Sequence, residues 1–136
     1  MDTPDLQQRA DAGDPEACMA MARKLMRGRG VPRNYEAALR YFDTAARSGS
    51  ADALYQLGKC YLKGVGCTKD PTGGVSCLEA AARLGHVSAA LRLGECFEQG
   101  IGAPHNAELA AYWYRKVAAM GDSRAYDCLL RLSRAR

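Results

Sequence analysis

The sequence predicts an all-α protein, a right-handed α/α superhelical solenoid of about three helix-turn-helix repeats with a capping helix at each end. Two observations predict this fold. Gly13, Gly49, Gly85 and Gly121 lie 36 residues apart, which is a period typical of helical repeat proteins. Within each period, apolar residues recur at helical spacing in two stretches. Neither stretch can bury its apolar side alone, so stacked repeats must complete the core.

Other columns agree when the chain is aligned on these glycines. Alanine stands four residues after each glycine, methionine or leucine stands eight residues after it, and the second half of each repeat carries large side chains. These columns are Ala17, Ala53, Ala89 and Ala125; Met21, Leu57, Leu93 and Leu129; Tyr41, Cys77 and Trp113; and Phe42, Leu78 and Tyr114. We therefore divide the single domain 1–136 into an N-terminal capping helix (1–12), repeats at 13–48, 49–84 and 85–120, and a C-terminal capping helix (121–136).

Capping residues mark the helix starts in order along the chain. Thr3-Pro4, Asp14-Pro15 and Asp70-Pro71 each place a side-chain acceptor before a proline at the first helical position. Further predicted caps are Asn34, Ser50 and Asn106.

Glycine pairs follow the first helix of every repeat: Gly28 and Gly30, Gly64 and Gly66, Gly100 and Gly102. A phosphate-binding loop would follow a strand and open a helix, whereas these pairs close a helix. We therefore interpret the first glycine as a helix stop and the second as a turn residue. A different pair, Gly73-Gly74, falls inside the second helix of repeat 2. Since each glycine costs about 1 kcal/mol relative to alanine there, we expect the start of that helix to fray.

Composition is that of an ordinary soluble domain, with 136 residues, 48% hydrophobic and 25% charged. The net charge of +4 is not gathered into a block of like charges, so it does not indicate a nucleic-acid partner. No apolar run approaches the roughly 20 residues of a membrane span. The polar N-terminus lacks a signal-peptide pattern. We expect a cytoplasmic protein, monomeric, with no membrane or nucleic-acid partner.

Catalytic and metal-binding patterns are weak. The six cysteines (Cys18, Cys60, Cys67, Cys77, Cys96 and Cys128) include no Cys-x-x-Cys knuckle, although a Cys60–Cys67 disulfide stays open. The two histidines, His86 and His105, both fall near turns and are interpreted as solvent-facing. No carboxylate pair is suited to acid–base chemistry. We predict no enzyme activity, no metal and no cofactor.

The stretches ADALYQLGKCYLKGVG and AAYWYRKVAAMG resemble the Sel-one-like repeat family, which is related to tetratricopeptide repeats. The resemblance covers residues 13 to 121. It implies a non-enzymatic adaptor or scaffold for other proteins, and it permits a regulatory or immunity-type inhibitor in bacteria. The alternative hypothesis is a small enzyme or metal/redox protein that uses the cysteines.

A cysteine-rich branch of the same family joins neighbouring repeats by disulfides. At those positions this chain has Ala46 with Leu54 and Ala82 with Ala90, and Cys18 falls opposite Ala10. The disulfides of that branch, and the penicillin binding suggested for it, are therefore not implied here.

By the same resemblance, the first helix of each repeat lines a concave groove that binds a protein or peptide. Equivalent positions in the three repeats form an expected apolar stripe, flanked by basic residues at one end and glutamates at the other. The candidate partner-binding residues are Met19, Arg23, Met26, Arg27, Tyr55, Lys59, Leu62, Lys63, Leu91, Glu95 and Glu98. We expect a partner that places acidic residues at the basic end and basic residues near the glutamates.

Overall fold

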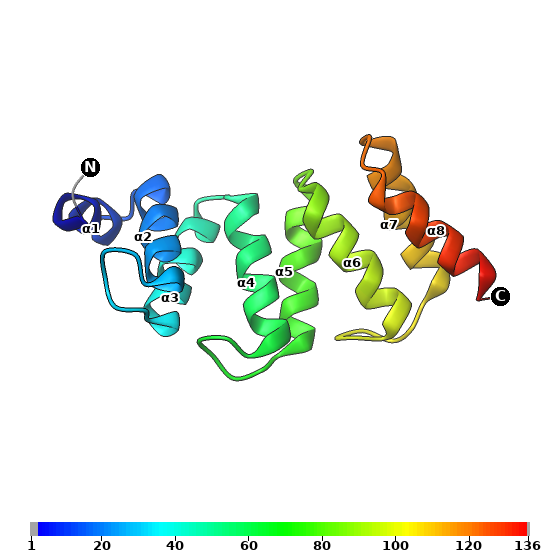
Figure 1. The fold of residues 1–136 in the computed structure, drawn as a ribbon, viewed down its shortest axis with the longest axis horizontal. Helices are drawn as coiled ribbons and strands as arrows, with labels where there is room; N and C mark the ends of the chain where they lie inside the picture. The colour runs from blue at the N-terminus through cyan, green and yellow to red at the C-terminus, as the bar shows by residue number, and fades with distance from the viewer. Residues whose placement is uncertain (1–2, 136) are drawn as a thin grey trace.

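The computed structural model describes residues 3–135, which contain eight α-helices and no strand. The helices are α1 (Thr3–Asp11), α2 (Pro15–Arg27), α3 (Tyr35–Arg47), α4 (Ala51–Lys63), α5 (Pro71–Arg83), α6 (Val87–Gln99), α7 (Ala107–Ala119) and α8 (Arg124–Arg134). Successive helices pack side by side in one row, and the chain termini lie at opposite ends of that row (Figure 1). The predicted all-α repeat architecture is confirmed.

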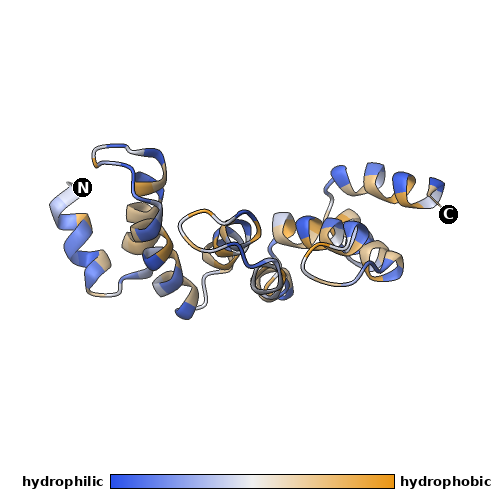
Figure 2. Cartoon of the chain, turned by 90° about the horizontal axis from the view of Figure 1, so that it is seen from below, coloured by the Kyte–Doolittle hydropathy of each residue, from blue (hydrophilic) through white to orange (hydrophobic). Residues whose placement is uncertain are grey.

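Five of the six predicted caps are confirmed, whereas Thr3 lies inside α1, which begins at Thr3 rather than at Pro4. The side chains of Asp14, Asn34, Ser50, Asp70 and Asn106 each accept a backbone N–H from the first turn of the helix that follows. The first glycine of each pair ends a helix in the left-handed conformation, with φ of 71°, 74° and 69° at residues 28, 64 and 100. Hydrophobic and hydrophilic residues alternate around the helical turns (Figure 2), as amphipathic packing requires.

The second glycine of the pairs in repeats 2 and 3 has a tertiary role as well as a turn role. Gly66 and Gly102 both have positive φ. A β-carbon on Gly66 would lie 2.6 Å from the carbonyl oxygen of Tyr35, and one on Gly102 would collide with the carbonyl oxygen of Pro71. Tyr35 and Pro71 begin the second helices of the preceding repeats. These glycines therefore let each loop rest directly on the backbone of the repeat before it.

The expected fraying at Gly73-Gly74 was wrong. Helix α5 begins at Pro71 and is capped by Asp70, with both glycines inside it. A β-carbon on Gly74 would lie 2.9 Å from the carbonyl oxygen of Gly58 and 2.9 Å from Cγ of Leu62. The missing side chain thus allows α4 and α5 to cross backbone against backbone, and tertiary packing offsets the low helix propensity of the pair.

The buried core forms two clusters that meet between α4 and α5. The first runs from Leu6 in α1 to Leu57 in α4, and the second runs from Val75 in α5 to Leu132 in α8. Phe42 and Tyr114 are the largest fully buried side chains of the two clusters. Within residues 3–135, no helix combines the length and hydrophobicity that would let it cross a membrane. One side of the first helix of each repeat is not buried in this core.

Candidate protein-binding face

One face of the molecule is built by the first helix of each repeat together with the C-terminal helix. We call it the A face. It consists of these partly or fully exposed residues of α2, α4, α6 and α8 and the turn before α6: Arg23, Met26, Arg27, Asp52, Tyr55, Lys59, Leu62, Lys63, His86, Glu95, Glu98 and Arg131. Nine of the eleven residues predicted from the sequence to bind a partner belong to this face, on helices α2, α4 and α6. The other two, Met19 and Leu91, are treated below.

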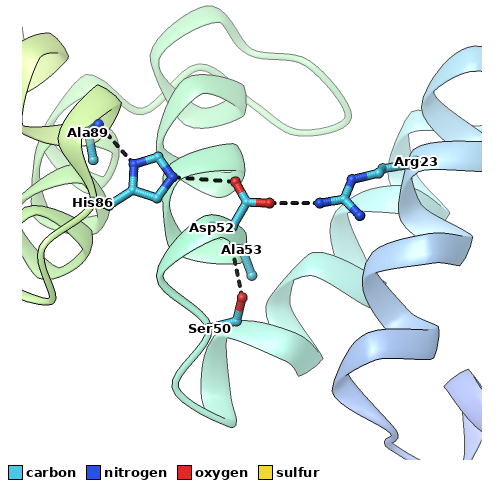
Figure 3. Close-up of polar contacts among 6 residues, drawn as sticks. All are labelled: Arg23, Ser50, Asp52, Ala53, His86 and Ala89. Carbon is cyan, nitrogen blue, oxygen red and sulfur yellow. Dashed lines mark hydrogen bonds and ion pairs between the residues drawn. The ribbon is translucent and has the colours of Figure 1, made fainter. Parts of the chain in front are cut away.

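A polar chain on the A face joins all three repeats (Figure 3). Arg23 on α2 donates from Nη2 to Oδ2 of Asp52 on α4 at 2.7 Å. The other carboxylate oxygen of Asp52 lies 3.4 Å from Nε2 of His86. His86 Nδ1 accepts the backbone N–H of Ala89 at 3.1 Å. Because Nδ1 is the acceptor, the proton of the neutral ring sits on Nε2, where it can be donated to Asp52.

His86 is therefore not the solvent-facing turn residue that the sequence suggested. It is the N-cap of α6, and its side chain is only 19% exposed. The repeat register contained the signal for this role. The residue directly after each repeat glycine is Asp14, Ser50, His86 or Asp122, and the first three cap the helix that follows. Histidine was overlooked because it is not among the residues that usually cap helices.

Tyr55 lies at the centre of the A face between a histidine and a lysine. Its ring centroid is 4.6 Å from that of His86, with the two planes inclined by 31°. Lys59 Nζ lies 4.5 Å from the Tyr55 centroid, within the range of a cation–π contact. Tyr55 is half-buried, and its ring lies between His86 and the charged Lys59.

Glu98 belongs to a second polar link, near the C-terminal end. It accepts the hydroxyl proton of Tyr114 at 2.6 Å and two guanidinium N–H groups of Arg131, at 2.7 and 2.9 Å. The hydrogen bonds from Arg131 lower the pKa of Glu98 most, and the hydrogen bond from Tyr114 lowers it further. Burial acts in the opposite direction, but the pKa stays below its usual range. Burial and the neighbouring carboxylate together raise the pKa of Tyr114 well above its usual range.

This link changes the expected charge pattern of the face. Glu98 has a side chain only 14% exposed, and its carboxylate is neutralised by Arg131. The acidic end predicted from the sequence is therefore reduced to Glu95, which is half-buried and lies 3.9 Å from the guanidinium of Arg92. The sequence showed both glutamates but could not show that α8 carries a cation to one of them.

The apolar stripe is also narrower than expected. Met19 and Leu91 are only 7% and 6% exposed and belong to the two core clusters. Tyr55, Leu62 and Met26 are half-buried and supply the apolar surface that remains. The expectation that Met19, Tyr55 and Leu91 form an open stripe was wrong, because the side chains of Met19 and Leu91 pack into the core.

The basic side chains of the face are more accessible. Arg27 and Lys63 are exposed and Lys59 is half-buried, and none of the three has an ion-pair partner among residues 3–135. Arg23 is already paired with Asp52. Polar contacts thus join the helices of the A face, and three cations surround a small apolar area on it.

All six cysteines lie within the described residues, and each is a free thiol. Cys18 donates to the carbonyl oxygen of Ala10 at 3.3 Å. Burial raises the pKa of the Cys60, Cys77 and Cys96 thiols above the usual value of 9.0. These thiols are protonated at neutral pH, which makes them weak nucleophiles. Residues 3–135 contain no group of three or more His, Cys, Asp or Glu side chains arranged to hold a metal ion.

The repeat positions and the helical packing agree with a known family. The Sel1 repeat profile matches residues 15–50, 51–86 and 87–122. The chain belongs to the Sel1 repeat family. Members of this family are repeat scaffolds that commonly mediate protein–protein interactions. No curated protein matches the chain significantly.

Several solved structures resemble this Sel1 repeat protein. A Sel1 repeat protein from Oxalobacter formigenes is 37% identical, with a TM-score of 0.82 over 93% of this chain and 96% of that one. A protective antigen of uropathogenic Escherichia coli with an SLR fold is 28% identical, with a TM-score of 0.87. That match covers 91% of this chain but only 27% of the antigen.

Cysteine-rich protein B from Helicobacter pylori shares the fold at 21% identity, with a TM-score of 0.71 over 91% of this chain and 94% of that one. This likeness shows a common fold only.

Proposed function

We propose that this Sel1 repeat protein is a non-enzymatic adaptor that binds a segment of a partner protein on its A face. The observation that carries the proposal is the set of three cations without ion-pair partners among residues 3–135, Arg27, Lys59 and Lys63, beside the partly exposed apolar side chains of Tyr55 and Leu62. Apolar anchors surrounded by charge are typical of protein interfaces.

The polar contacts that join the helices of the A face support the same proposal. The Arg23–Asp52–His86 chain joins α2, α4 and the start of α6, and the Glu98–Arg131 pair joins α6 to α8. A surface that is already ordered loses little conformational entropy when a partner binds. The unpaired cations would then steer an acidic partner and orient it on the face.

The alternative, an enzyme or redox protein that uses its cysteines, has less support. Burial keeps Cys60, Cys77 and Cys96 protonated at neutral pH, and reactive cysteines require the thiolate. Of the two histidines, His86 uses the Nδ1 lone pair to cap α6, so that nitrogen is not available as a base for a thiol.

The test is affinity capture with matched charge variants. The parent protein is immobilised and exposed to extract of the native cell, and the proteins retained are identified by mass spectrometry. Lys59→Glu with Lys63→Glu reverses two charges on the A face. Arg40→Glu with Arg115→Glu makes the same change in net charge on α3 and α7. Thermal melts of all three proteins establish that each is folded.

We expect the parent and the Arg40/Arg115 variant to retain the same partner, and the Lys59/Lys63 variant to lose it. In kinetic measurements with that partner, the Lys59/Lys63 variant should associate more slowly and show weaker salt dependence. Loss of the partner only in the Arg40/Arg115 variant would move the interface to the opposite face and overturn the proposal.

A further inference from the structure

A cavity of about 420 Å³ opens between repeats 2 and 3. It lies where the C-terminal end of α4 and the loop before α5 approach α6 and the loop that follows α6. Leu62 and Ile101 supply apolar walls, and Cys96 lies at the base with only 2% exposure. The position continues the A face, because Leu62, Lys63 and Glu95 belong to both.

The charges around this inter-repeat pocket are unbalanced. Three cations, Lys63, Lys69 and Arg92, line it against one carboxylate, Glu95. Lys63 and Lys69 have no ion-pair partner among residues 3–135. The Arg92 guanidinium reaches Glu95 only at 3.9 Å, and its Nε is buried with no hydrogen-bond acceptor.

An unsatisfied buried donor is costly, so native structures usually provide it with an acceptor. Arg92 therefore has unused hydrogen-bonding capacity in the pocket wall, in addition to the two unpaired lysines. An incoming anion near the Arg92 guanidinium would allow the side chain to reorient and satisfy its N–H groups. A carboxylate suits that geometry, because the guanidinium fork and the carboxylate can form paired hydrogen bonds.

A second cavity of similar volume shows the contrast. It lies among α1, α2 and α3 and measures about 430 Å³. Two of its polar side chains pair with each other, since the hydroxyl of Tyr41 donates to Asp11 at 2.6 Å, and Arg40 is the one cation among its lining residues. Of these two cavities, the inter-repeat pocket is the one that combines an apolar wall with several cations, and for that reason it is the better candidate for binding an acidic group.

We propose that the inter-repeat pocket recognises an acidic segment of a partner protein in which an Asp or Glu stands next to a large apolar residue. The carboxylate sits among Lys63, Lys69 and Arg92, and the apolar side chain packs on Leu62 and Ile101. This inference rests on the proposed function of the A face and specifies the chemistry of the partner. Lys59, one turn before Lys63 on α4, extends the basic surface for a second acidic residue.

Other anions fit the pocket less well. A nucleic acid needs a track of cations along its backbone and aromatic side chains for stacking, and no aromatic residue lines the inter-repeat pocket. A phosphate dianion would be repelled by Glu95 more strongly than a single carboxylate is. The apolar wall formed by Leu62 and Ile101 also has no use in binding free phosphate.

The test begins with a random dodecapeptide display library panned against the parent protein. We expect enriched peptides to carry Asp or Glu beside Leu, Ile, Phe or Met. A labelled copy of the best peptide is then titrated against the parent, Lys63→Glu with Lys69→Glu, and the control Arg40→Glu with Arg115→Glu. The pocket variant should bind on the order of tenfold more weakly, while the control should bind like the parent. In an NMR titration, the largest shifts should come from Lys63, Lys69, Arg92 and Ile101.

A charge swap separates recognition from a general loss of structure. A peptide in which the enriched acidic residue is replaced by Lys should bind the parent poorly and regain affinity for the Lys63→Glu/Lys69→Glu variant. Failure of that rescue, or affinity that is indifferent to the pocket variant, overturns the inference. Competition by inorganic phosphate or by an oligothymidine, with stronger binding at the same residues, also overturns it.

Different experimental results would contradict the pocket inference and the A-face proposal. If enriched peptides lack acidic residues, or bind elsewhere on α2, α4 or α6, the pocket inference falls and the proposed A-face function stands. If no peptide is enriched, the pocket inference is likewise overturned. The A-face proposal falls only when the capture experiment also shows a partner that is insensitive to Lys59 and Lys63.

Discussion

In repeats 2 and 3 the two helices of the repeat cross in close contact, but different residues make that contact. In repeat 2, Gly58 on α4 faces Gly74 on α5, and the contact is made largely by backbone, with a β-carbon on Gly74 falling 2.9 Å from the Gly58 carbonyl oxygen. In repeat 3, Gly94 on α6 faces the ring of Tyr114 on α7, which is fully buried. One crossing is therefore closed by removing side chains, and the other is filled by a large one.

The two crossings also differ in the residues to which they are linked. Tyr114 reaches through the core to Glu98, which pairs with Arg131 on α8, so the crossing of repeat 3 is tied to the A face. The crossing of repeat 2 lies where the two core clusters meet, and its two glycines lie against each other's backbone and the side chains of Leu62 and Leu78. The close contact at this crossing is therefore apolar, whereas that of repeat 3 is linked to an ion pair.

The largest effect is expected from Gly94→Val. A β-carbon there would lie 2.6 Å from Cε1 of Tyr114, and the ring cannot move aside easily because it is buried and its hydroxyl is held by Glu98. Overpacking of this kind costs about 1 to 3 kcal/mol of unfolding free energy, and we expect the upper part of that range. Urea unfolding of variant and parent measures the difference. A variant as stable as the parent would show that the two helices separate freely.

A smaller effect is expected from Gly74→Ala, which adds one methyl group at the crossing of repeat 2. The clash with the Gly58 carbonyl oxygen costs about 1 to 3 kcal/mol, and the gain in helix propensity returns about 1 kcal/mol. The net result is a loss of about 1 kcal/mol, measured by urea unfolding.

Gly73→Ala is the matched control, because it adds the same group at the neighbouring position of α5. Its β-carbon would meet the carboxylate of Asp70, whose Oδ1 accepts the Gly73 N–H as the cap of α5. A shift of that side chain offsets part of the gain in helix propensity, so the stability of the variant should stay within about 1 kcal/mol of the parent. If the two alanine variants have equal stability, close backbone contact is not the reason for glycine at position 74.

The smallest effect is the part of the acid dependence that Glu98 contributes in repeat 3. Arg131 lowers the folded-state pKa of Glu98 below its usual value of 4.5, so the unfolded state binds the proton first as the pH falls. The stabilisation is complete above about pH 4.5 and is lost as the pH falls from there through the lower folded-state pKa. Glu98→Gln should therefore lose less stability than the parent between pH 7 and pH 3.

Melting temperatures at those two pH values compare the parent with Glu98→Gln, and Gly74→Ala serves as the reference for the crossing of repeat 2. That reference should retain the acid dependence of the parent. An equal loss in the parent and in Glu98→Gln would mean that Glu98 makes no net contribution to the acid response.

The sequence by itself determined the period, the helices and most of their ends. These features are local, since a capping side chain such as Asn34 or a left-handed glycine such as Gly64 acts within a few residues of its own position. The core columns were also readable, because a buried position such as Ala53 or Tyr114 recurs in register with its neighbours. The family followed from the same columns.

Only the tertiary structure decided which of the candidate site residues stay open. Met19 and Leu91 became core, Glu98 was neutralised by Arg131, and His86 became a helix cap joined to Asp52. The inter-repeat pocket was likewise invisible, because its residues come from two repeats and two loops. Exposure and charge pairing depend on how closely separate helices approach one another, and that distance is set by contacts between residues far apart in the sequence, such as Gly66 against Tyr35 of the preceding repeat.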